Sequence, residues 1–594
     1  MRTRRMSGMR RSVVGPVAAF GAILLLLGAG RLEAGDPWLA PPFSLSAEEL
    51  LRWGADARPP EAGKPLRLFD EVRTTFDAAG KRTLTFRRVQ MVPDGGAIEG
   101  VGPIEAFWQP WKDLPPVLRG RVVRPDGSTS DLDQGSVADR PFKSEPGMFD
   151  DRRIRNAPLQ GLEPGGVAEW ETVVVEKEGF PGGRSGRLFL SNRNPARCLR
   201  VVIQVPVSSR LRWAIRGIPS FEPKVSSSGE RTTYTFELLD APASLEWEKG
   251  LPRDVVLLPW LDFSVEESWE AVAALYSSLS GAALRSLDPA SLKGFPDVSK
   301  ASEKEKVARI LDAIRRNVRY TGLEFGLSAW IPADPRVTWE RRFGDCRDQA
   351  ALLVSLLRHA GVEADVALLR TGSRDDIEPE VPSLRLFDHA IVRIASVPPV
   401  WIDPTSAFDP AGRVPVGEEG RRALICRSGV KELEAIPFTS VRDNMWISRI
   451  EVRLSDEGPG AFKEVRESTG WIDSSQRATY DRLNEAERKK FLESIAAGRF
   501  GREASLARFE ASPPRDLSRP FLVTIDGSKA GVAQTSHSEA VVAVDPSLVF
   551  GTLPAVAGER RAPLRLLARH PRRSGRAVPR LRHLRARLRP HPVP

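Results

Sequence analysis

The feature that most constrains the fold is residues 341–350, Arg-Arg-Phe-Gly-Asp-Cys-Arg-Asp-Gln-Ala, which lead into a long apolar stretch. Asp345 is a typical helix N-cap, and leucines recur at helical spacing until Gly361, a typical C-terminal stop. Gly344 is expected to allow the turn before the helix. The pattern therefore predicts a buried helix with Cys346 in its first turn, where the helix dipole and free N–H groups favour thiolate over thiol.

Two predicted strands further along the chain carry the partners that such a thiol needs. Residues 387–394, Phe-Asp-His-Ala-Ile-Val-Arg-Ile, contain His389, and residues 399–405, Pro-Val-Trp-Ile-Asp-Pro-Thr, end in Asp403. Together with the cysteine these are the parts of a Cys-His-Asp triad, in which the thiolate attacks an acyl carbon, the imidazole moves the proton and the carboxylate fixes the imidazole tautomer. Alone, the histidine would read as a core residue and the aspartate as a turn former. A competing histidine, His359, is expected to bond a carbonyl at its own helix end.

These motifs resemble those of the bacterial transglutaminase-like superfamily. Gly-Asp-Cys-Arg-Asp, Phe-Asp-His-Ala and Trp-Ile-Asp-Pro-Thr follow in that order, and Tyr-Thr-Gly-Leu-Glu-Phe-Gly at 320–326 fits the same pattern. The resemblance implies a papain-like α+β domain with Cys346 as nucleophile, His389 as base and Asp403 as the residue that orients the base. It leaves the reaction open, because relatives include protein cross-linkers, peptidases, amidases and members that have lost catalysis.

Further side chains are candidates for stabilising an oxyanion or lining a cleft. The backbone N–H of Cys346 is expected to be one oxyanion donor because it lies at a helix start, and Tyr320 or Trp330 is a candidate for the second. Either aromatic residue could equally belong to the core. Trp339 is expected to border the cleft, and the polar loop at 371–385 is expected to be a substrate-access flap.

No motif for a metal or a cofactor is visible in the sequence. It has no Cys-x-x-Cys, no His-x-x-x-His and no Gly-rich phosphate loop, and the aspartates around the cysteine lack the spacing of a calcium loop. With three cysteines the chain is no disulfide scaffold, and Cys198 and Cys426 are expected to be buried free thiols. We therefore expect neither a bound metal nor a cofactor.

The expected fold class is multidomain α+β: an N-terminal β-sandwich, a central papain-like transglutaminase-like domain and a C-terminal β-rich module. Short strands separated by Gly/Pro turns predict the sandwich at 60–250, which resembles the β domain of unknown function that often precedes bacterial transglutaminase-like domains. The catalytic domain is expected at 255–435 and the C-terminal module at 440–555. An Arg-rich tail at 556–594 is expected to be disordered and to take no part in function, as a solvated arm or as sequence read out of frame.

Helices are also predicted outside the stretch that carries the cysteine, beginning with a short one within 44–58. Capping-box patterns at Ser264 and Ser302 predict two helices that pack on the helix of the cysteine. A polar helix is predicted at about 475–497 within the C-terminal module.

Residues 1–34 have the parts of a secretory signal: five arginines, an apolar stretch and a Leu-Glu-Ala cleavage site. The alternative is an uncleaved anchor, although the apolar stretch is short for a membrane span. The chain is therefore expected to be exported, periplasmic or secreted, with no membrane span after the signal is removed and with envelope association left open.

The formal charge of +11 is concentrated at the two ends of the chain. Twelve arginines lie from Arg560 onward and five within the first eleven residues, and without them the net charge turns negative. A nucleic-acid partner is therefore not expected. The sequence favours an exported, thiol-dependent acyl-transfer enzyme with a protein or peptide substrate. The alternative is a catalytically silent module that binds a peptide or envelope polymer with the same fold.

Overall fold

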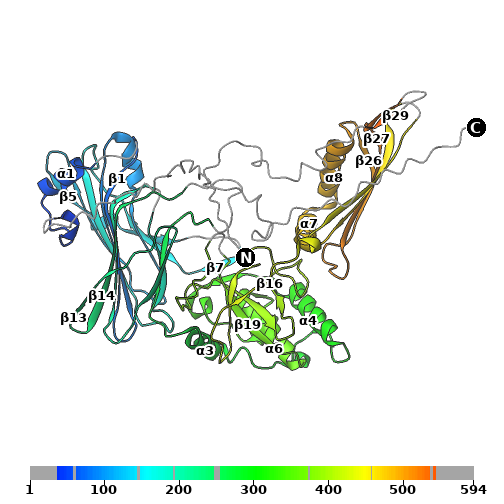
Figure 1. Ribbon diagram of the computed structural model, residues 1–594, viewed down its shortest axis with the longest axis horizontal. Coiled ribbons are helices and arrows are strands. Elements are labelled where there is room, and N and C mark those ends of the chain that lie inside the picture. The colour runs from blue at the N-terminus through cyan, green and yellow to red at the C-terminus, as the bar shows by residue number, and fades with distance from the viewer. Residues whose placement is uncertain are drawn as a thin grey trace, which may run out of the picture.

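The computed structural model describes residues 36–57, 62–142, 147–191, 194–245, 255–371, 375–455, 458–535 and 540–542. Figure 1 shows three regions: a β-rich N-terminal region in blue to blue-green, a mixed central region in green and a C-terminal region in yellow and orange. The predicted signal segment and the Arg-rich tail lie outside the described residues. Within these ranges, no helix is both long and apolar enough to cross a membrane.

The N-terminal region is built almost entirely of strands. Its elements are α1 (Ala47–Ala55), β1 (Leu66–Phe76), β2 (Arg82–Met91), α2 (Ile98–Val101), β3 (Ile104–Trp108), β4 (Val117–Val123), β5 (Thr129–Asp131), β6 (Ala138–Pro141), β7 (Met148–Asp150), β8 (Arg153–Ala157), β9 (Val167–Val175), β10 (Ser185–Phe189), β11 (Ala196–Pro206), β12 (Arg212–Arg216), β13 (Lys224–Ser228), β14 (Arg231–Ala241) and β15 (Trp260–Ser264). Eight strands form one sheet in the order β13-β14-β11-β1-β2-β9-β4-β5, and two three-stranded sheets have the orders β10-β15-β12 and β3-β8-β6. Only the β1–β11 pair of the large sheet is parallel.

Alternation of side chains explains why these strands form layers. In β4 the side chain of Leu118 is buried while that of Arg119 is exposed, as expected for a strand with one covered face. Helix α1 begins at a capping box between Ser46 and Glu49 and buries Leu50 and Trp53 in the same core as β1. The N-terminal region therefore has its own hydrophobic cores.

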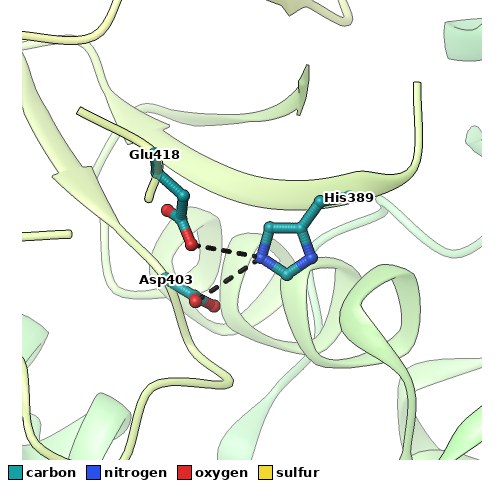
Figure 2. A group of neighbouring side chains, drawn as sticks. All are labelled: His389, Asp403 and Glu418. Carbon is teal, nitrogen blue, oxygen red and sulfur yellow. Dashed lines mark ion pairs between the residues drawn. The ribbon is translucent and has the colours of Figure 1, made fainter. Parts of the chain in front are cut away.

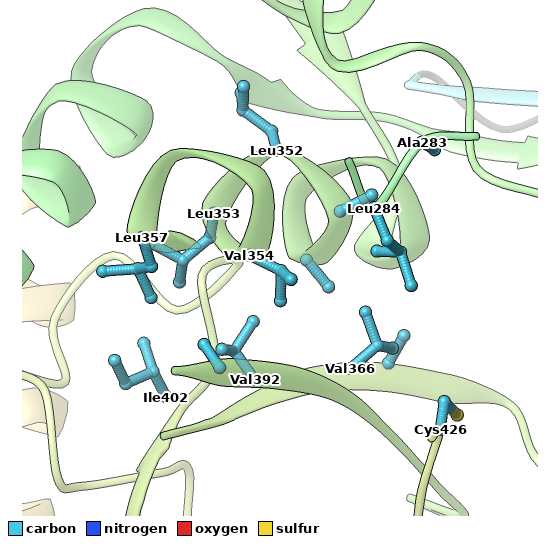
Figure 3. Close-up of a cluster of buried hydrophobic side chains, with 14 of the residues drawn as sticks. Ala283, Leu284, Leu352, Leu353, Val354, Leu357, Val366, Val392, Ile402 and Cys426 are labelled. Atoms are coloured by element: carbon cyan, nitrogen blue, oxygen red, sulfur yellow. The ribbon is translucent and has the colours of Figure 1, made fainter. Parts of the chain in front are cut away.

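The central region combines helices with a five-stranded antiparallel sheet. Its elements are α3 (Trp269–Ser280), α4 (Glu303–Asn317), β16 (Arg319–Tyr320), β17 (Gly322–Glu324), α5 (Pro335–Arg341), β18 (Phe343–Gly344), α6 (Cys346–His359), β19 (Ala364–Leu369), β20 (His389–Ile394), β21 (Val400–Ile402), β22 (Arg422–Ile425) and β23 (Glu434–Ala435). The sheet has the order β21-β20-β19-β22-β23. Helix α6 lies across one face, and its Leu353 and Val354 point at Val366 and Val392 of the strands (Figure 3). This packing fixes the start of α6 against the sheet that carries His389.

The capping boxes predicted for the central region have different outcomes. The box at Ser302 is confirmed, because its hydroxyl accepts the N–H of Glu305 at the start of α4. The box at Ser264 is wrong, since β15 pairs with β10 and β12 and Ser264 is the last residue of that strand. Helix α3 is capped instead by Ser268.

The C-terminal region is a four-stranded antiparallel sheet with two helices. Its elements are β24 (Trp446–Arg453), β25 (Gly460–Ser468), α7 (Gly470–Arg482), α8 (Glu485–Phe500), β26 (Ser505–Ala511), β27 (Phe521–Ala530), β28 (Ala533–Thr535) and β29 (Ala540–Val542). The main sheet has the order β24-β25-β27-β26. The single helix predicted at about 475–497 is wrong: Leu483 is extended, and Asn484 forms a capping box with Glu487 that begins a second helix.

The N-terminal and central regions are joined by polar and backbone contacts. Strand β7 pairs in parallel with β17, and the hydroxyl of Ser383 donates to that of Ser185 at 2.8 Å. The predicted flap at 371–385 is wrong over its described residues 375–385, because Ile377 and Leu384 are buried in the central core. The predicted cleft position of Trp339 is also wrong: the ring is 1% exposed and its N–H donates to the Lys293 carbonyl at 3.1 Å.

Candidate active site

Cys346 lies in the first turn of α6, where a reciprocal cap fixes the helix start. Asp345 Oδ1 accepts the N–H of Asp348 at 3.0 Å, and Asp348 Oδ2 accepts the N–H of Asp345 at 3.2 Å. This arrangement satisfies backbone donors that a helix otherwise leaves unpaired. The two aspartates that flank the cysteine in the motif therefore orient its backbone.

Gly344 is needed for space and not for an unusual turn. The left-handed residue before the helix is Arg342, with φ of 63°, whereas Gly344 has no positive φ. A Cβ atom on Gly344 would lie 2.7 Å from Cβ of Asp348 and 3.1 Å from Cγ2 of Thr338. The expectation that this glycine allows the turn is therefore wrong, and its role is to let the capping aspartate pack against the chain.

The residues that follow Cys346 tie the helix start to the preceding loop. The Arg347 guanidinium donates to Asp345 Oδ2 at 2.9 Å from Nε and also to the carbonyl of Ala329. Asp348 Oδ1 accepts the N–H of Ala333 at 2.7 Å. Each residue of the Gly-Asp-Cys-Arg-Asp motif thus has a structural partner that fixes where the thiol lies.

His389 opens β20 and is held between the thiol and two carboxylates. Its Nε2 lies 3.4 Å from Oδ2 of Asp403 and 3.5 Å from Oε1 of Glu418, while the second ring nitrogen points away from both acids (Figure 2). Cys346 is close enough to the imidazole that its sulfur helps to raise the pKa of the ring. Burial lowers the pKa of His389, but the hydrogen bonds to Asp403, Cys346 and Glu418 outweigh it and hold the pKa well above its usual value.

Asp403 follows β21, with one of its carboxylate oxygens facing His389 and the other held by Thr405. Its Oδ1 accepts the N–H and the hydroxyl of Thr405 at 2.8 and 2.7 Å, and its carbonyl accepts from Arg315 of α4 at 3.1 Å. Burial raises the pKa of this carboxyl, but the hydrogen bond and charge of His389 and the bond from Thr405 bring it down to about 2. Asp403 is therefore ionised at neutral pH.

Glu418 is a site residue that sequence reasoning missed. It lies in the turn before β22, and its side chain is 5% exposed. Burial raises the pKa of its carboxyl to about 8, against the opposing hydrogen bond with His389, and the Asp403 charge adds to the rise. The only local signal is a pair of adjacent glutamates in a turn, and such pairs are usually solvated.

The two aromatic candidates have different surroundings. Tyr320 pairs with Gly344 in the short β16–β18 ladder, and its side chain is half exposed. Burial of its inner part and the Cys346 charge raise the pKa of the hydroxyl to about 12, so at neutral pH it is a proton donor. Trp330 lies against Phe180 of the N-terminal region, with ring centroids 4.9 Å apart.

The described residues also contain one group with the donors of a metal site. His389, Asp403 and Glu418 offer one nitrogen and two carboxylate oxygens that lie within 4.8 Å of one another. The group is scattered over the chain, so no sequence spacing announces it. An ion there would compete with the proton on Nε2 that the two carboxylates share.

The remaining histidine and cysteines of interest lie elsewhere. His359 is at the far end of α6. Its Nε2 lies 3.6 Å from Oδ1 of Asp288, whereas the sequence predicted a bond to a backbone carbonyl. Cys198 and Cys426 are buried free thiols, as expected, and burial raises the pKa of both.

Comparisons with known proteins match two stretches of the chain to family models. Residues 296–403 match the family model of the transglutaminase-like superfamily, and residues 78–244 match DUF3857, a domain of unknown function for which structures have been solved. The chain therefore carries a transglutaminase-like domain preceded by a DUF3857 domain.

The chain is also similar to solved structures at low sequence identity. One is the crystal structure of a putative protease from Parabacteroides distasonis, with 14% identity and a TM-score of 0.49, covering 79% of this chain and 94% of that one. Another is an M1 zinc metallopeptidase from Deinococcus radiodurans, with 12% identity and a TM-score of 0.18, covering 34% of this chain and 42% of that one. A comparison with curated proteins found no match.

Proposed function

We propose that this protein is a thiol-dependent acyl-transfer enzyme in which Cys346 is the nucleophile, His389 the proton carrier and Asp403 the residue that orients it. The observation that carries the proposal is the His389 ring, which interacts with the Cys346 thiol and has Nε2 within 3.5 Å of two carboxylates. A thiol with a hydrogen-bonded base, which a third group orients in turn, is the general arrangement of an activated nucleophile.

The reaction proceeds through a thioester. The Cys346 sulfur attacks the carbonyl carbon of a carboxamide or peptide, the carbon–nitrogen bond breaks, and the imidazolium of His389 gives its proton to the departing amine or ammonia. Water or a second amine then attacks the thioester, His389 takes the proton of that nucleophile, and the thiolate leaves. Hydrolysis and transfer to an amine use the same residues, so the acceptor decides the product.

The oxyanion that forms during the attack needs donors near the sulfur. The N–H of Cys346 at the helix start is one candidate. The Tyr320 hydroxyl is the other, because it is protonated at neutral pH and close enough to feel the charges of Cys346 and His389. Trp330 is a candidate for the cleft wall where the N-terminal and central regions meet.

The finer description of the molecule belongs to the same proposal. The central domain is a papain-like fold, and the N-terminal sheets form a β-sandwich. The protein is exported, with residues 1–34 as its signal, and acts on a protein or peptide in the envelope or outside the cell.

The test is labelling of the full chain with an iodoacetamide probe at pH 6.5, followed by mass spectrometry of the modified cysteine. The expected result is fast labelling of Cys346 that Cys346→Ala abolishes, with no change in the matched variants Cys198→Ala and Cys426→Ala. A Cys346 that reacts no faster than an ordinary thiol with pKa ~8.5 contradicts the proposal.

A further inference from the structure

Glu418 lies where a structural role alone does not explain it. Its side chain is 5% exposed, Oε1 is 3.5 Å from Nε2 of His389, and Oε2 is buried without a hydrogen-bond partner among the described residues. The carboxyl group of Asp403 lies beside it, because ligand atoms of His389, Asp403 and Glu418 are all within 4.8 Å of one another. Two carboxyl groups and one imidazole nitrogen therefore meet at a single buried point.

Such a cluster is stable only if one carboxyl group keeps its proton. Two carboxylates this close repel each other, and the apolar surroundings favour the neutral form of one of them. Asp403 is the ionised member, because Thr405 and His389 donate to it and bring its pKa to about 2. Glu418 is the neutral member at pH 7, since burial raises its pKa to about 8.

The charged groups around Glu418 come from several elements. His389 faces it from β20 and Asp403 from the end of β21. Cys346 of α6 lies across the imidazole, and Arg315 of α4 reaches the Asp403 carbonyl at 3.1 Å. On the Glu418 turn itself, the neighbouring Glu419 accepts from the Thr439 hydroxyl, and Arg421 donates its backbone N–H to the Glu418 carbonyl at 3.1 Å.

We propose that Glu418 is a positioning residue for the reaction: its Oε1 accepts from Nε2–H of His389 beside Asp403, which keeps Nδ1 of the ring towards Cys346. The inference rests on the proposed function, because it assigns a second residue, after Asp403, that orients the His389 imidazole. The neutral acid leaves the pair with one negative charge, which matches the single positive charge of the imidazolium. When Glu418 ionises, the second charge holds the proton on His389 more tightly and impedes its transfer to the leaving amine.

The experiment compares four full-length proteins: wild type, Glu418→Ala, Glu418→Gln and Glu419→Gln. Glu419 is the matched control, since it is the adjacent, equally buried glutamate and bonds to Thr439. The first readout is the second-order rate of Cys346 alkylation by iodoacetamide at pH 6.5. The second is the pH titration of the His389 Cε1 carbon signal by NMR between pH 6 and 10, assigned with His389→Ala.

We expect Glu418→Ala to lower the alkylation rate about tenfold or more, the range found when a partner of a functional imidazole is lost. Glu418→Gln should lower it less, because the amide oxygen can still accept from Nε2–H. Glu419→Gln should match wild type. The His389 signal of wild type and Glu419→Gln should show an inflection near pH 8 that Glu418→Gln lacks. That readout does not depend on whether Glu418→Ala folds.

Three outcomes overturn the inference. They are alkylation of Glu418→Ala as fast as that of Glu419→Gln, an inflection near pH 8 that persists in Glu418→Gln, and uptake of one Zn²⁺ per chain that Glu418→Gln abolishes, which would make Glu418 a metal ligand. Slow alkylation of Cys346 in the wild-type protein contradicts the proposed function instead. That measurement needs no variant, so the two failures can be told apart.

Discussion

Cys346 and Cys426 belong to one hydrophobic core and differ in what the sulfur contacts. Both are buried, with 5% and 2% of the residue exposed. Cys346 begins a helix and interacts with the His389 imidazole, whereas Cys426 follows a strand and its Sγ donates to the Leu424 carbonyl at 3.6 Å. Burial raises the pKa of Cys426, which keeps that thiol neutral.

The comparison separates burial from activation. An apolar core by itself makes a thiol inert, and both sulfurs experience that core. The Cys346 end of the core receives the capped start of α6 and the first residue of β20 with its carboxylates. Reactivity at Cys346 is therefore expected to depend on these groups and not on how buried the sulfur is.

Removal of the imidazole should have the largest effect. His389→Ala leaves Cys346 at the capped start of α6 without its base, so its alkylation rate at pH 6.5 should fall by about 10²- to 10⁴-fold, the usual contribution of a positioned acid–base group. The control is His359→Ala, which removes an exposed imidazole at the opposite end of α6. Equal alkylation rates in wild type and His389→Ala would refute the distinction between the two cysteines.

Acid should weaken the Cys346 end of the core selectively. The folded pKa of Asp403, about 2, is below its unfolded value of 3.8, so its contribution to stability is complete above pH 3.8 and is lost as pH falls towards 2. The loss corresponds to about 2 kcal/mol. Denaturant unfolding at pH 4.5 and 2.5 should show a loss of stability in wild type and in Cys426→Ala that is larger than the loss in Asp403→Asn, where other acids with lowered pKa values, such as Glu464, still titrate.

The contribution of Glu418 to stability changes with pH in the opposite direction, so it has to be measured in a separate pH range. Its folded pKa of about 8 exceeds the ordinary 4.5, so the folded protein loses stability as pH rises between these values. Measurements at pH 4.5 and below avoid the pH range in which the Glu418 contribution changes. An Asp403→Asn variant with the same acid-dependent loss as wild type would show that another group is responsible.

A methyl group at Gly344 should disturb the start of α6 without touching the sulfur. Gly344→Ala places a carbon 2.7 Å from Cβ of Asp348, so the reciprocal cap must shift. Overpacking of this kind costs between about 1 and 2 kcal/mol, and labelling of Cys346 should slow. Gly361→Ala is a useful contrast, because it strains a left-handed glycine at the other end of the helix with nothing nearby. Slower labelling in Gly361→Ala alone would contradict the role of the cap.

Local patterns explain what sequence could predict at this site. The Asp345 cap, the leucine spacing and the strands of His389 and Asp403 each depend on a few neighbouring residues, and the structure has the helix and both strands where the patterns predicted them. Glu418 could not be found in this way, because its place beside His389 depends on how the turn before β22 folds over the sheet.

The errors have the same origin. Ser264 looks like a helix cap until β15 pairs with two strands that are remote in sequence. The segment at 375–385 looks like a loop because it is polar and contains proline, but Ser383 bonds to Ser185 of another region and Leu384 packs in the core. In both places, tertiary contacts override a local signal.

The smallest predicted effect is at Cys426, and it tests the other half of the comparison. Cys426→Ala removes one buried sulfur from a packed core, so it should lower the free energy of unfolding by about 1 kcal/mol, as small core truncations do. The rate of Cys346 labelling should stay unchanged, since no group that contacts His389 is altered. Denaturant unfolding measures the free energy of unfolding, and probe kinetics on the same sample measure the labelling rate. Cys346→Ala is the contrasting variant, because it removes the labelled sulfur itself. If Cys426→Ala slowed labelling as much as it lowered stability, packing and not the imidazole would control the reactive thiol.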